Sequence, residues 1–296
     1  MLTLHEHRNS GRNHCQRIMH GFDGTELAMK YVVKLGDSIL EDPRLLHNCI
    51  LAIIELVRDG HQVTVVHGGG TALSRTLALL GKQTEFVSGS RFTDAETRDT
   101  AVMVLGGQVN KTLVAALASH GQSAVGLTGA DGLLFRARKK RTTPDLGYVG
   151  EIVDSDIRWL YAIWQLAAVP VISSIALGLD GEYYTVSSDE MAGACAIATK
   201  ADELVFLTGL PGVRAAGGEL IRWLSIDAID QLTRDKAVTG HLLPKLRAGR
   251  EALLRGVTRV CILPADAARL FPDLASSRSN FATEVTNDWR QFLLNT

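Results

Sequence analysis

The chain is poor in cysteine, with four cysteines that lie far apart among 296 residues. None belongs to a CxxC pair, and their spacing does not suit a zinc site, so neither a disulfide framework nor a structural zinc is expected. We predict buried free thiols in a reducing compartment. The four are Cys15, Cys49, Cys195 and Cys261.

The chain also lacks an excess of charge of either sign and a long apolar run. Its formal net charge of −1 gives no electrostatic reason to expect a nucleic acid or an anionic membrane as a partner. The most apolar stretch, residues 160–177, is interrupted by Gln165 and Pro170, which indicates a helix end and a buried strand rather than a membrane span. Residues 1–29 read as a polar tail without the apolar core of a secretory signal. We therefore expect a cytoplasmic protein.

What the chain has instead is 46% hydrophobic residues, enough to bury one large core or two adjoining ones. After Met29, short β-rich runs alternate with amphipathic segments of helix length. Strands separated by helices require right-handed crossovers, so the pattern predicts an α/β fold with a largely parallel sheet covered on both faces. Strands are expected at residues 31–33, 63–66, 123–127, 169–173, 204–207 and 257–263, and helices at 43–58, 71–80, 95–120, 157–168, 188–199, 225–235 and 244–254.

One segment departs from this alternation. Residues 133–153 read as a β-hairpin whose tip carries the basic run Arg136–Arg141. A charge run of this kind is usually a solvated loop, and we expect the same here.

Two of the predicted strands stop in glycine. The first ends in Lys34-Leu-Gly36-Asp37, and the second ends in His67 followed by Gly68 to Gly70. Bare backbone N–H groups beside a lysine favour a multiply charged phosphate, and three successive glycines make sense chiefly where a ligand approaches the main chain. Neither segment is a Walker A loop or a GxGxxG fingerprint. The pattern points to phosphoryl transfer.

Further candidate residues are weaker when each is taken alone. Arg91 precedes a predicted helix and could clamp a carboxylate through two hydrogen bonds, or could pair with Asp94. Asp189 could be a first-turn acid favoured by the helix dipole. Lys245 follows Pro244 just inside a helix, where a solvated lysine is common. The turn at residues 207–212 could admit a nucleotide or be a simple turn.

The order and spacing of these segments resemble one family closely. The chain is similar to N-acetylglutamate kinases of the amino acid kinase superfamily from about Tyr31 to Val285, through seven collinear matches that together are highly specific. The matching segments are residues 33–36 (VKLG), 66–70 (VHGGG), 89–97 (GSRFTDAET), 109–111 (VNK), 125–132 (VGLTGADG), 146–151 (LGYVGE) and 243–245 (LPK).

The resemblance implies a three-layer α/β/α sandwich, the amino acid kinase fold. It divides the chain into the tail 1–29, an N-terminal lobe 30–180 that binds the acyl amino acid and a C-terminal lobe 181–296 that binds the nucleotide. The implied reaction passes the γ-phosphoryl group of ATP to the side-chain carboxylate of N-acetyl-L-glutamate or a related acid, as in arginine biosynthesis. A homodimer built across the N-terminal lobe is typical of such proteins.

The resemblance also implies roles for individual residues. Lys34 and Lys245 would neutralise the migrating phosphoryl group from opposite sides, and Asp189 would hold both amines in position. Mg²⁺ would be carried on the ATP phosphates, with no protein metal site, and ATP and the acid are the expected partners. Residues matching ATP-contacting positions are Gly36, Asp37, Gly68, Gly69, Thr208, Gly209 and Gly212; those matching substrate positions are Gly69, Gly70, Arg91, Thr185 and Ser187.

Several positions depart from the family pattern. Asp37 stands where a second glycine is usual, and a carboxylate roughly 4 Å from one phosphate charge would cost about 4 kcal/mol at an effective dielectric near 20. An extra metal ion, a protonated Asp37 or a side chain turned outward could remove this cost. Thr185 and Ser187 replace asparagines that hydrogen-bond the acylamino group. In the nucleotide lobe, Gly209 replaces an aspartate, and His241 and Ala282 replace glycines.

These departures leave three interpretations open. The first is a working kinase of a small carboxylate, which intact Lys34, Asp189 and Lys245 favour. The second is a non-catalytic paralogue that binds a metabolite or partner, in which Asp37 marks lost phosphoryl transfer. The third is a kinase of the same fold that acts on carbamate or on a carrier-linked aminoadipate, the latter using the basic run 136–141 to hold an acidic carrier.

Overall fold

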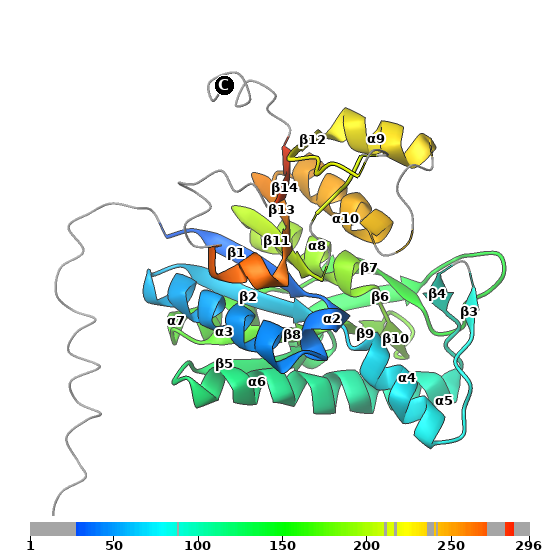
Figure 1. Cartoon of the computed structure of the whole chain (residues 1–296). Helices are drawn as coiled ribbons and strands as arrows, with labels where there is room; N and C mark the ends of the chain where they lie inside the picture. The colour runs from blue at the N-terminus through cyan, green and yellow to red at the C-terminus, as the bar shows by residue number, and fades with distance from the viewer. Residues whose placement is uncertain are drawn as a thin grey trace, which may run out of the picture.

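The computed structural model describes residues 28–87, 89–209, 212–215, 218–235, 240, 242–270 and 282–286. Its centre is an eight-stranded sheet with the order β12-β14-β13-β11-β1-β2-β8-β5 (Figure 1). All neighbouring strands run parallel except the antiparallel pair β13–β14. The strands are β1 (Lys30–Leu35), β2 (Gln62–His67), β5 (Ala124–Thr128), β8 (Val169–Ser173), β11 (Glu203–Thr208), β12 (Trp223–Ser225), β13 (Arg259–Pro264) and β14 (Thr283–Thr286).

Helices cover both faces of this sheet, which confirms the three-layer α/β/α sandwich. Side chains alternate along β1, so that Val32 enters one buried cluster and Val33 the other. One face packs α7 (Arg158–Gln165), α8 (Ser188–Thr199), α9 (Ile226–Arg234) and α10 (Leu242–Leu254). The other packs α2 (Asp37–Leu40), α3 (Pro43–Arg58), α6 (Asn110–Ser119) and the 3₁₀ turn η4 (Ala265–Leu270).

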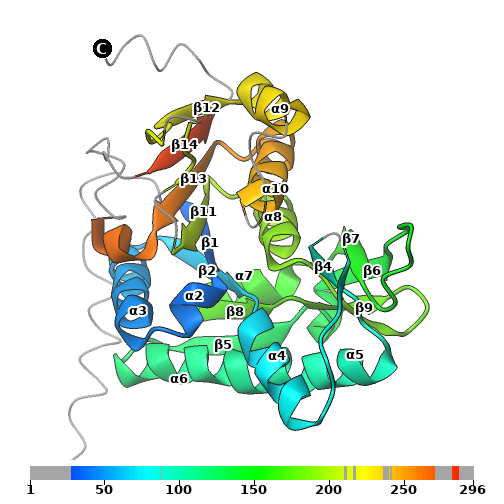
Figure 2. The same ribbon diagram turned by 45° about the vertical axis from the view of Figure 1, so that its right-hand side comes forward.

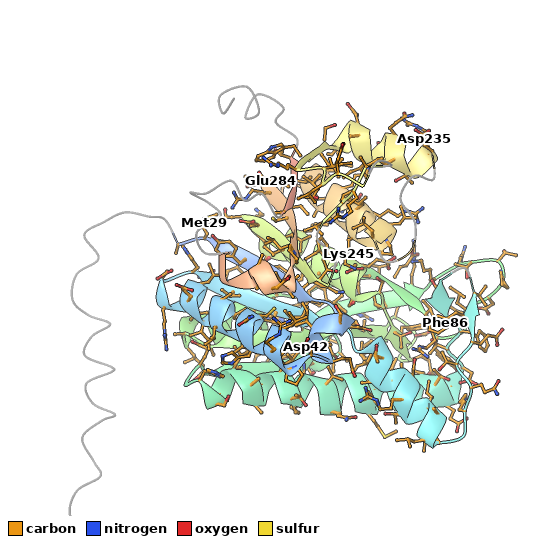
Figure 3. All side chains as sticks on the ribbon, in the orientation of Figure 1. Met29, Asp42, Phe86, Asp235, Lys245 and Glu284 are labelled. Atoms are coloured by element: carbon orange, nitrogen blue, oxygen red, sulfur yellow. The ribbon has the colours of Figure 1, made fainter. Side chains whose placement is uncertain are left out.

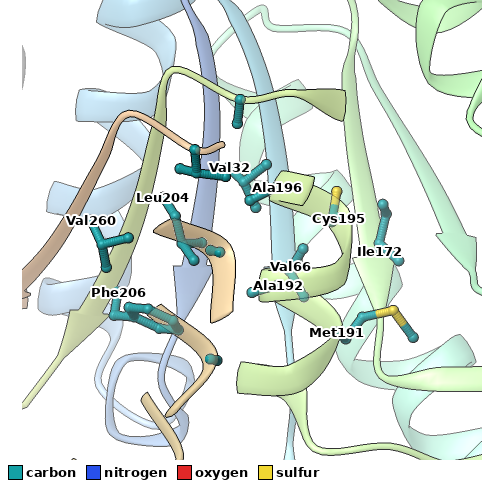
Figure 4. Packing of buried hydrophobic residues seen from close by; sticks show 14 of the residues in the cluster. Val32, Val66, Ile172, Met191, Ala192, Cys195, Ala196, Leu204, Phe206 and Val260 are labelled. Atoms are coloured by element: carbon teal, nitrogen blue, oxygen red, sulfur yellow. The ribbon is translucent and has the colours of Figure 1, made fainter. Parts of the chain in front are cut away.

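The α8 face shows how tightly the middle layer is enclosed. Met191, Ala192, Cys195 and Ala196 of α8 lie fully buried against strand residues that include Val66 (Figure 4). Small residues on the inner side of α8 let the helix lie close to the sheet, since large ones there would overfill the layer. The N-terminus of α8 is thereby held over the strand ends.

The three cysteines within the described residues are free and buried, as predicted, while Cys15 lies outside the described residues. Burial raises the pKa of the Cys49 thiol to about 12, and it also raises the pKa values of Cys195 and Cys261. At neutral pH these thiols stay protonated and behave as small apolar side chains.

A long helical segment, residues 95–119, runs beneath the N-terminal half of the sheet (Figure 1). It comprises α5 (Ala95–Ala101), the π-helical stretch η2 (Val102–Val109) and α6, and Asp94 caps its start by accepting from the Thr97 amide. By length and composition alone this helix could cross a membrane. Its inner side contacts β5, β8 and α3, so in this structure it forms part of the outer helical layer of the sandwich.

A smaller sheet lies beside the main one and was not predicted as a separate unit. It has the order β10-β9-β6-β7 and contains β6 (Phe135–Lys139), β7 (Gly150–Ser155), β9 (Ile175–Gly178) and β10 (Tyr183–Thr185). Its antiparallel pair β6–β7 confirms the predicted hairpin.

A further hairpin, β3 (Phe86–Val87) with β4 (Ser90–Arg91), follows α4 (Gly70–Leu79) at the same end of the molecule (Figure 2). One short 3₁₀ turn, η3 (Asp131–Leu133), precedes β6.

The connectivity fixes where a ligand can approach. From β1 the chain moves in one direction to β2, β8 and β5, and only later returns to the other side of β1 with β11. In open parallel sheets such a switch leaves a crevice outside the carboxyl ends of the strands, where ligands usually bind. Both glycine-ended strands, β1 and β2, stop at this edge.

Candidate active site

Two lysines and one carboxylate from three different elements meet at the carboxyl edge of the sheet. Lys34 Nζ of β1 lies 3.0 Å from Asp189 Oδ1, and Lys245 Nζ of α10 lies 3.2 Å from Asp189 Oδ2. All three side chains are buried, with exposed fractions of 4% for Lys34, 6% for Asp189 and 6% for Lys245. The cluster therefore brings together three residues that the sequence analysis singled out separately.

Close packing between α8 and α10 sets the position of Lys245. A Cβ built on Gly193 of α8 would lie 3.3 Å from the carbonyl oxygen of Ala248, so a larger side chain there would push α10 away. On the other side of α10, a Cβ on Gly249 would lie 2.9 Å from Val260 of β13. Figure 3 shows Lys245 on α10 above the end of the sheet. Small residues on both sides of α10 thus permit the contact with Asp189.

The cluster carries more positive than negative charge. Two ammonium groups share one carboxylate, and burying charges that are not fully compensated is expensive. Burial lowers the pKa of Lys245, the nearby Lys34 lowers it further, and Asp189 opposes both effects. A buried excess of positive charge is a poor way to stabilise a fold, but it suits a site that receives an anion.

The glycine turns lie beside this cluster. The Gly36 amide donates to the Leu207 carbonyl at 3.0 Å, which ties the end of β1 to the end of β11. A Cβ on Gly209 would lie 2.8 Å from Ser38 Oγ, so the turn after β11 also touches the start of α2. Gly69 adopts a φ of +135°, a conformation that side chains disfavour. The predicted phosphate-binding segments therefore converge on one edge.

Asp37 points into these turns and not away from them. Its Oδ1 accepts a hydrogen bond from the Gly69 amide at 3.1 Å. The alternative of a side chain turned outward is therefore wrong, because the carboxylate faces the glycine loop between β2 and α4.

His67 and Asn110 support the glycine loop from behind, and the sequence analysis assigned neither a role. The imidazole is fully buried, with Nδ1 2.8 Å from the Gly68 carbonyl oxygen and Nε2 3.0 Å from Asn110 Nδ2. An amide NH₂ can only donate, so Nε2 accepts and the proton is assigned to Nδ1, which donates to Gly68. Asn110 Nδ2 also donates to the Val171 carbonyl at 2.9 Å. The neutral ring thereby fixes the first peptide of the loop.

Acid should destabilise the protein through His67. Burial lowers the pKa of His67 from 6.5 to about 4, so the unfolded chain binds a proton that the folded chain does not between these values. The neutral ring makes its full contribution to the free energy of unfolding above pH 6.5. This contribution falls by about 1.4 kcal/mol per pH unit as the pH drops toward 4. We expect His67→Asn to be less stable than wild type near pH 7, with a gap that narrows below pH 6.5. Urea unfolding at several pH values measures this gap, and a constant gap would contradict the assignment.

Arg91 is held by neutral acceptors. Its guanidinium donates to Thr84 Oγ1 at 2.9 Å, Ser74 Oγ at 2.8 Å and the Gly70 carbonyl at 3.1 Å. The alternative pairing with Asp94 is wrong, because Asp94 accepts from Lys82 Nζ at 2.7 Å instead.

Since those three acceptors are uncharged, they orient the Arg91 guanidinium beside Gly70 without neutralising it. Burial lowers the pKa of Arg91, and the charge of Asp37 opposes that shift. This arrangement leaves the positive charge of Arg91 available to a carboxylate.

Thr185 and Ser187 flank the entry to α8. The Thr185 hydroxyl donates to the Tyr148 carbonyl at 3.2 Å and lies 3.5 Å from Thr93 Oγ1. Ser187 is the N-cap of α8, but its side chain makes no capping hydrogen bond. The structure thus brings Thr185 to the β4–α5 segment that carries Arg91 and leaves the Ser187 hydroxyl uncommitted to the helix.

The predicted nucleotide positions are less concentrated. Thr208 is buried at the end of β11, beside Gly209. Gly212 lies against β14 and has a φ of +95°. A Cβ added at this position would lie only 2.7 Å from Thr283 Oγ1, so both features require glycine. A nucleotide role for Gly212 therefore stays a prediction. Ala282 is buried, and His241 lies outside the described residues.

The basic run of the β6–β7 hairpin is largely paired. Its central residues form ion pairs, Arg138 with Glu151, Lys139 with Asp145 and Lys140 with Glu190. These partners compensate much of the positive charge, which weakens the idea of a docking surface for an acidic carrier and favours an ordinary solvated hairpin.

Comparison with known proteins agrees with this geometry. Residues 29–264 match the model of the amino acid kinase family. An acetylglutamate kinase of Acidobacterium capsulatum is 64% identical over 257 residues, covering 87% of this chain and 99% of that protein. One of Koribacter versatilis is 48% identical, covering 87% of this chain and 98% of that protein.

Solved structures add evidence on the fold alone, since their identities are low. N-acetylglutamate synthase of Neisseria gonorrhoeae superposes with a TM-score of 0.77 at 21% identity, covering 88% of this chain and 60% of that one. Carbamate kinase of Giardia lamblia superposes with a TM-score of 0.65 at 12% identity, covering 89% of this chain and 100% of that one. With its sheet order, its buried lysine cluster and these relatives, the chain belongs to the amino acid kinase family, among the acetylglutamate kinases.

Proposed function

We propose that this protein transfers the γ-phosphoryl group of ATP to the side-chain carboxylate of N-acetyl-L-glutamate, giving an acyl phosphate of the arginine-biosynthesis type. The observation that carries the proposal is the buried cluster in which Asp189 bridges Lys34 and Lys245 beside the glycine turns. The intact cluster favours a working kinase over a non-catalytic paralogue. The proposed setting is the cytoplasm, in keeping with the buried free thiols.

In the proposed reaction, a carboxylate oxygen of the substrate attacks the γ-phosphorus as the bond to the β-phosphate oxygen breaks, and ADP leaves. The substrate carboxyl group is already ionised at neutral pH, so no protein base is needed. Lys34 and Lys245 stabilise charge on the phosphoryl oxygens during transfer. Asp189 contacts both amines and holds them in place, so it acts as a positioning residue.

Mg²⁺ belongs to the proposal as a companion of the nucleotide. Within the described residues, no three His, Cys, Asp or Glu side chains are grouped so that they could hold a metal. Hydroxyl oxygens that suit Mg²⁺ do lie at the glycine turns, namely those of Ser38 and Ser188. When bound with ATP, the ion would neutralise phosphate charge.

We propose that most of the acceptor side of the site belongs to the N-terminal lobe, residues 30–180, with Thr185 and Ser187 contributed by the start of the C-terminal lobe. Arg91 would bind the α-carboxylate of the substrate, because its guanidinium is oriented beside Gly70 by neutral acceptors. Thr185 and Ser187 would contact the acetylamino group. The C-terminal lobe, residues 181–296, would bind the nucleotide through the turn that contains Thr208 and Gly209.

The experiment that tests the function measures ADP release with MgATP and acceptors that differ by one group. N-acetylglutamate should support turnover. 4-Acetamidobutanoate lacks the α-carboxylate that Arg91 would bind, and glutamate lacks the acetyl group, so both should be poor acceptors. N-acetylaspartate is one carbon shorter and tests reach. Equal rates with all four acids, or none with N-acetylglutamate, would contradict the proposed acceptor.

We also propose a homodimer built through the N-terminal lobe. The main sheet ends at β5, which has no further strand on its outer side within the described part of the chain. Met103 and Trp159 of this lobe are 63% and 56% exposed. An open sheet edge with apolar residues nearby is usually covered. Light scattering should give twice the chain mass of 32.0 kDa, and the mass of a single chain at micromolar concentration would contradict the proposal.

A further inference from the structure

The Asp37 carboxylate lies against three successive glycines at the place where the proposed function puts the migrating phosphoryl group. Asp37 Oδ1 accepts the Gly69 amide hydrogen bond at 3.1 Å. A Cβ built on Gly68 would lie 3.0 Å from Asp37 Oδ1, and one on Gly70 would lie 2.8 Å from Oδ2. These distances mean that the carboxylate occupies the space that side chains on Gly68 and Gly70 would need, while the amide of Gly69 holds it there.

The surrounding charges explain why an anion rests there. Lys34 and Lys245 both contact Asp189, and Arg91 is held by neutral acceptors, so these four side chains carry three positive charges and one negative charge. The negative charge of Asp37 favours the protonated forms of Lys245, Arg91 and His67. Asp37 therefore lies within the field of the site's cations and compensates part of their charge.

We propose that Asp37 is an internal anion. In the ligand-free enzyme its carboxylate occupies the anion-binding position beside the Gly69 amide, and it has to leave this amide before a phosphoryl group can enter. This inference rests on the proposed function for the identity of the group that displaces Asp37. Two anions cannot share one N–H donor and one set of cations without strong repulsion. Asp37 therefore weakens the binding of the nucleotide's terminal phosphate and sets its affinity.

Two variants separate the charge of Asp37 from its size. Asp37→Asn keeps the shape and can still accept from the Gly69 amide through its carbonyl oxygen, but it carries no charge. Asp37→Gly removes both the charge and the acceptor. Glu41→Gln is the matched control, because Glu41 follows the same helical turn and pairs with Arg75 outside the glycine loop.

The measurement is the dissociation constant of the complex between the protein and AMP-PNP, a non-hydrolysable ATP analogue. Titration calorimetry gives this constant in the presence and in the absence of Mg²⁺. We expect at least tenfold tighter binding by Asp37→Asn, binding by Asp37→Gly at least as tight as that, and no change in Glu41→Gln. Unchanged affinity in both Asp37 variants would overturn the inference. Weaker binding that appears only when Mg²⁺ is present would overturn it too, since Asp37 would then be a metal ligand.

Binding needs no turnover, so the two proposals can fail separately. Tighter binding in the variants, with no acyl phosphate from any acceptor, would support the internal anion and overturn the proposed function. Transfer to N-acetylglutamate with unchanged affinities would support the function and overturn the internal anion. If neither wild type nor the variants bind AMP-PNP, both proposals are wrong.

Discussion

Replacing Lys34 or Lys245 by methionine is expected to lower kcat about a thousandfold while the protein stays folded. Each lysine would stabilise charge that develops on the phosphoryl group, and removing one such contact typically costs 10²–10³-fold or more. Asp189 has two lysine partners at 3.0 and 3.2 Å, so a single replacement leaves it one ion pair. Folding should therefore survive the change.

Steady-state kinetics with MgATP and N-acetylglutamate measure the effect, with circular dichroism as the check on folding. Lys139→Met is the matched control, because this lysine pairs with Asp145 on the surface hairpin and should keep full activity. If either site variant retained more than a tenth of the wild-type kcat, Lys34 and Lys245 would not both act in transfer.

Asp189→Asn should give the largest loss of stability, about 3–5 kcal/mol, together with loss of activity. The carboxylate is 6% exposed and is the shared partner of two buried ammonium groups. An amide in its place leaves two like charges close together without their counter-ion, and breaking a buried pair in this way is strongly destabilising. Urea unfolding at pH 7 measures the change in the free energy of unfolding.

A double variant tests whether this loss arises from the charges. Asp189→Asn combined with Lys34→Met removes one of the two ammonium groups. The double variant should therefore lose less free energy of unfolding than the two single variants lose together. Strictly additive losses would mean that the stability effect of Asp189 does not come from its ion pairs.

Local sequence signals predicted most helices well. The helix expected at residues 43–58 has those bounds, because Asp42 accepts from the amides of Arg44 and Leu45 and Pro43 suits the first helical position. The helix at 188–199 and the strand at 169–173 also match. Caps, proline positions and apolar periodicity are properties of neighbouring residues, and so they can be read from the chain directly.

Features that depend on pairing across long distances were missed. The smaller sheet joins β6 to β9, and β14 pairs antiparallel with β13 at the far side of the main sheet. Both arrangements depend on which strands meet in space, and short strands carry little signal of their own. The π-helical stretch at Val102–Val109 also gave no recognisable signal in the sequence.

The site was predictable as a set of residues but not as a set of contacts. Lys34, Asp189 and Lys245 were identified from motif order, while their shared ion pairs appear only in the fold. The buried His67–Asn110 hydrogen bond joins residues 43 positions apart, so no local pattern indicates it. The direction of the Asp37 side chain likewise depends on the position of the β2–α4 loop.

The most direct test of the account is to trap the product. Enzyme, MgATP and N-acetylglutamate are incubated with hydroxylamine, and mass spectrometry locates the hydroxamate. The account predicts a hydroxamate on the side-chain carboxyl group, formed in step with ADP and abolished in Lys34→Met and Lys245→Met. ADP without hydroxamate, or a hydroxamate that persists in both variants, would contradict phosphoryl transfer to a carboxylate by this lysine cluster.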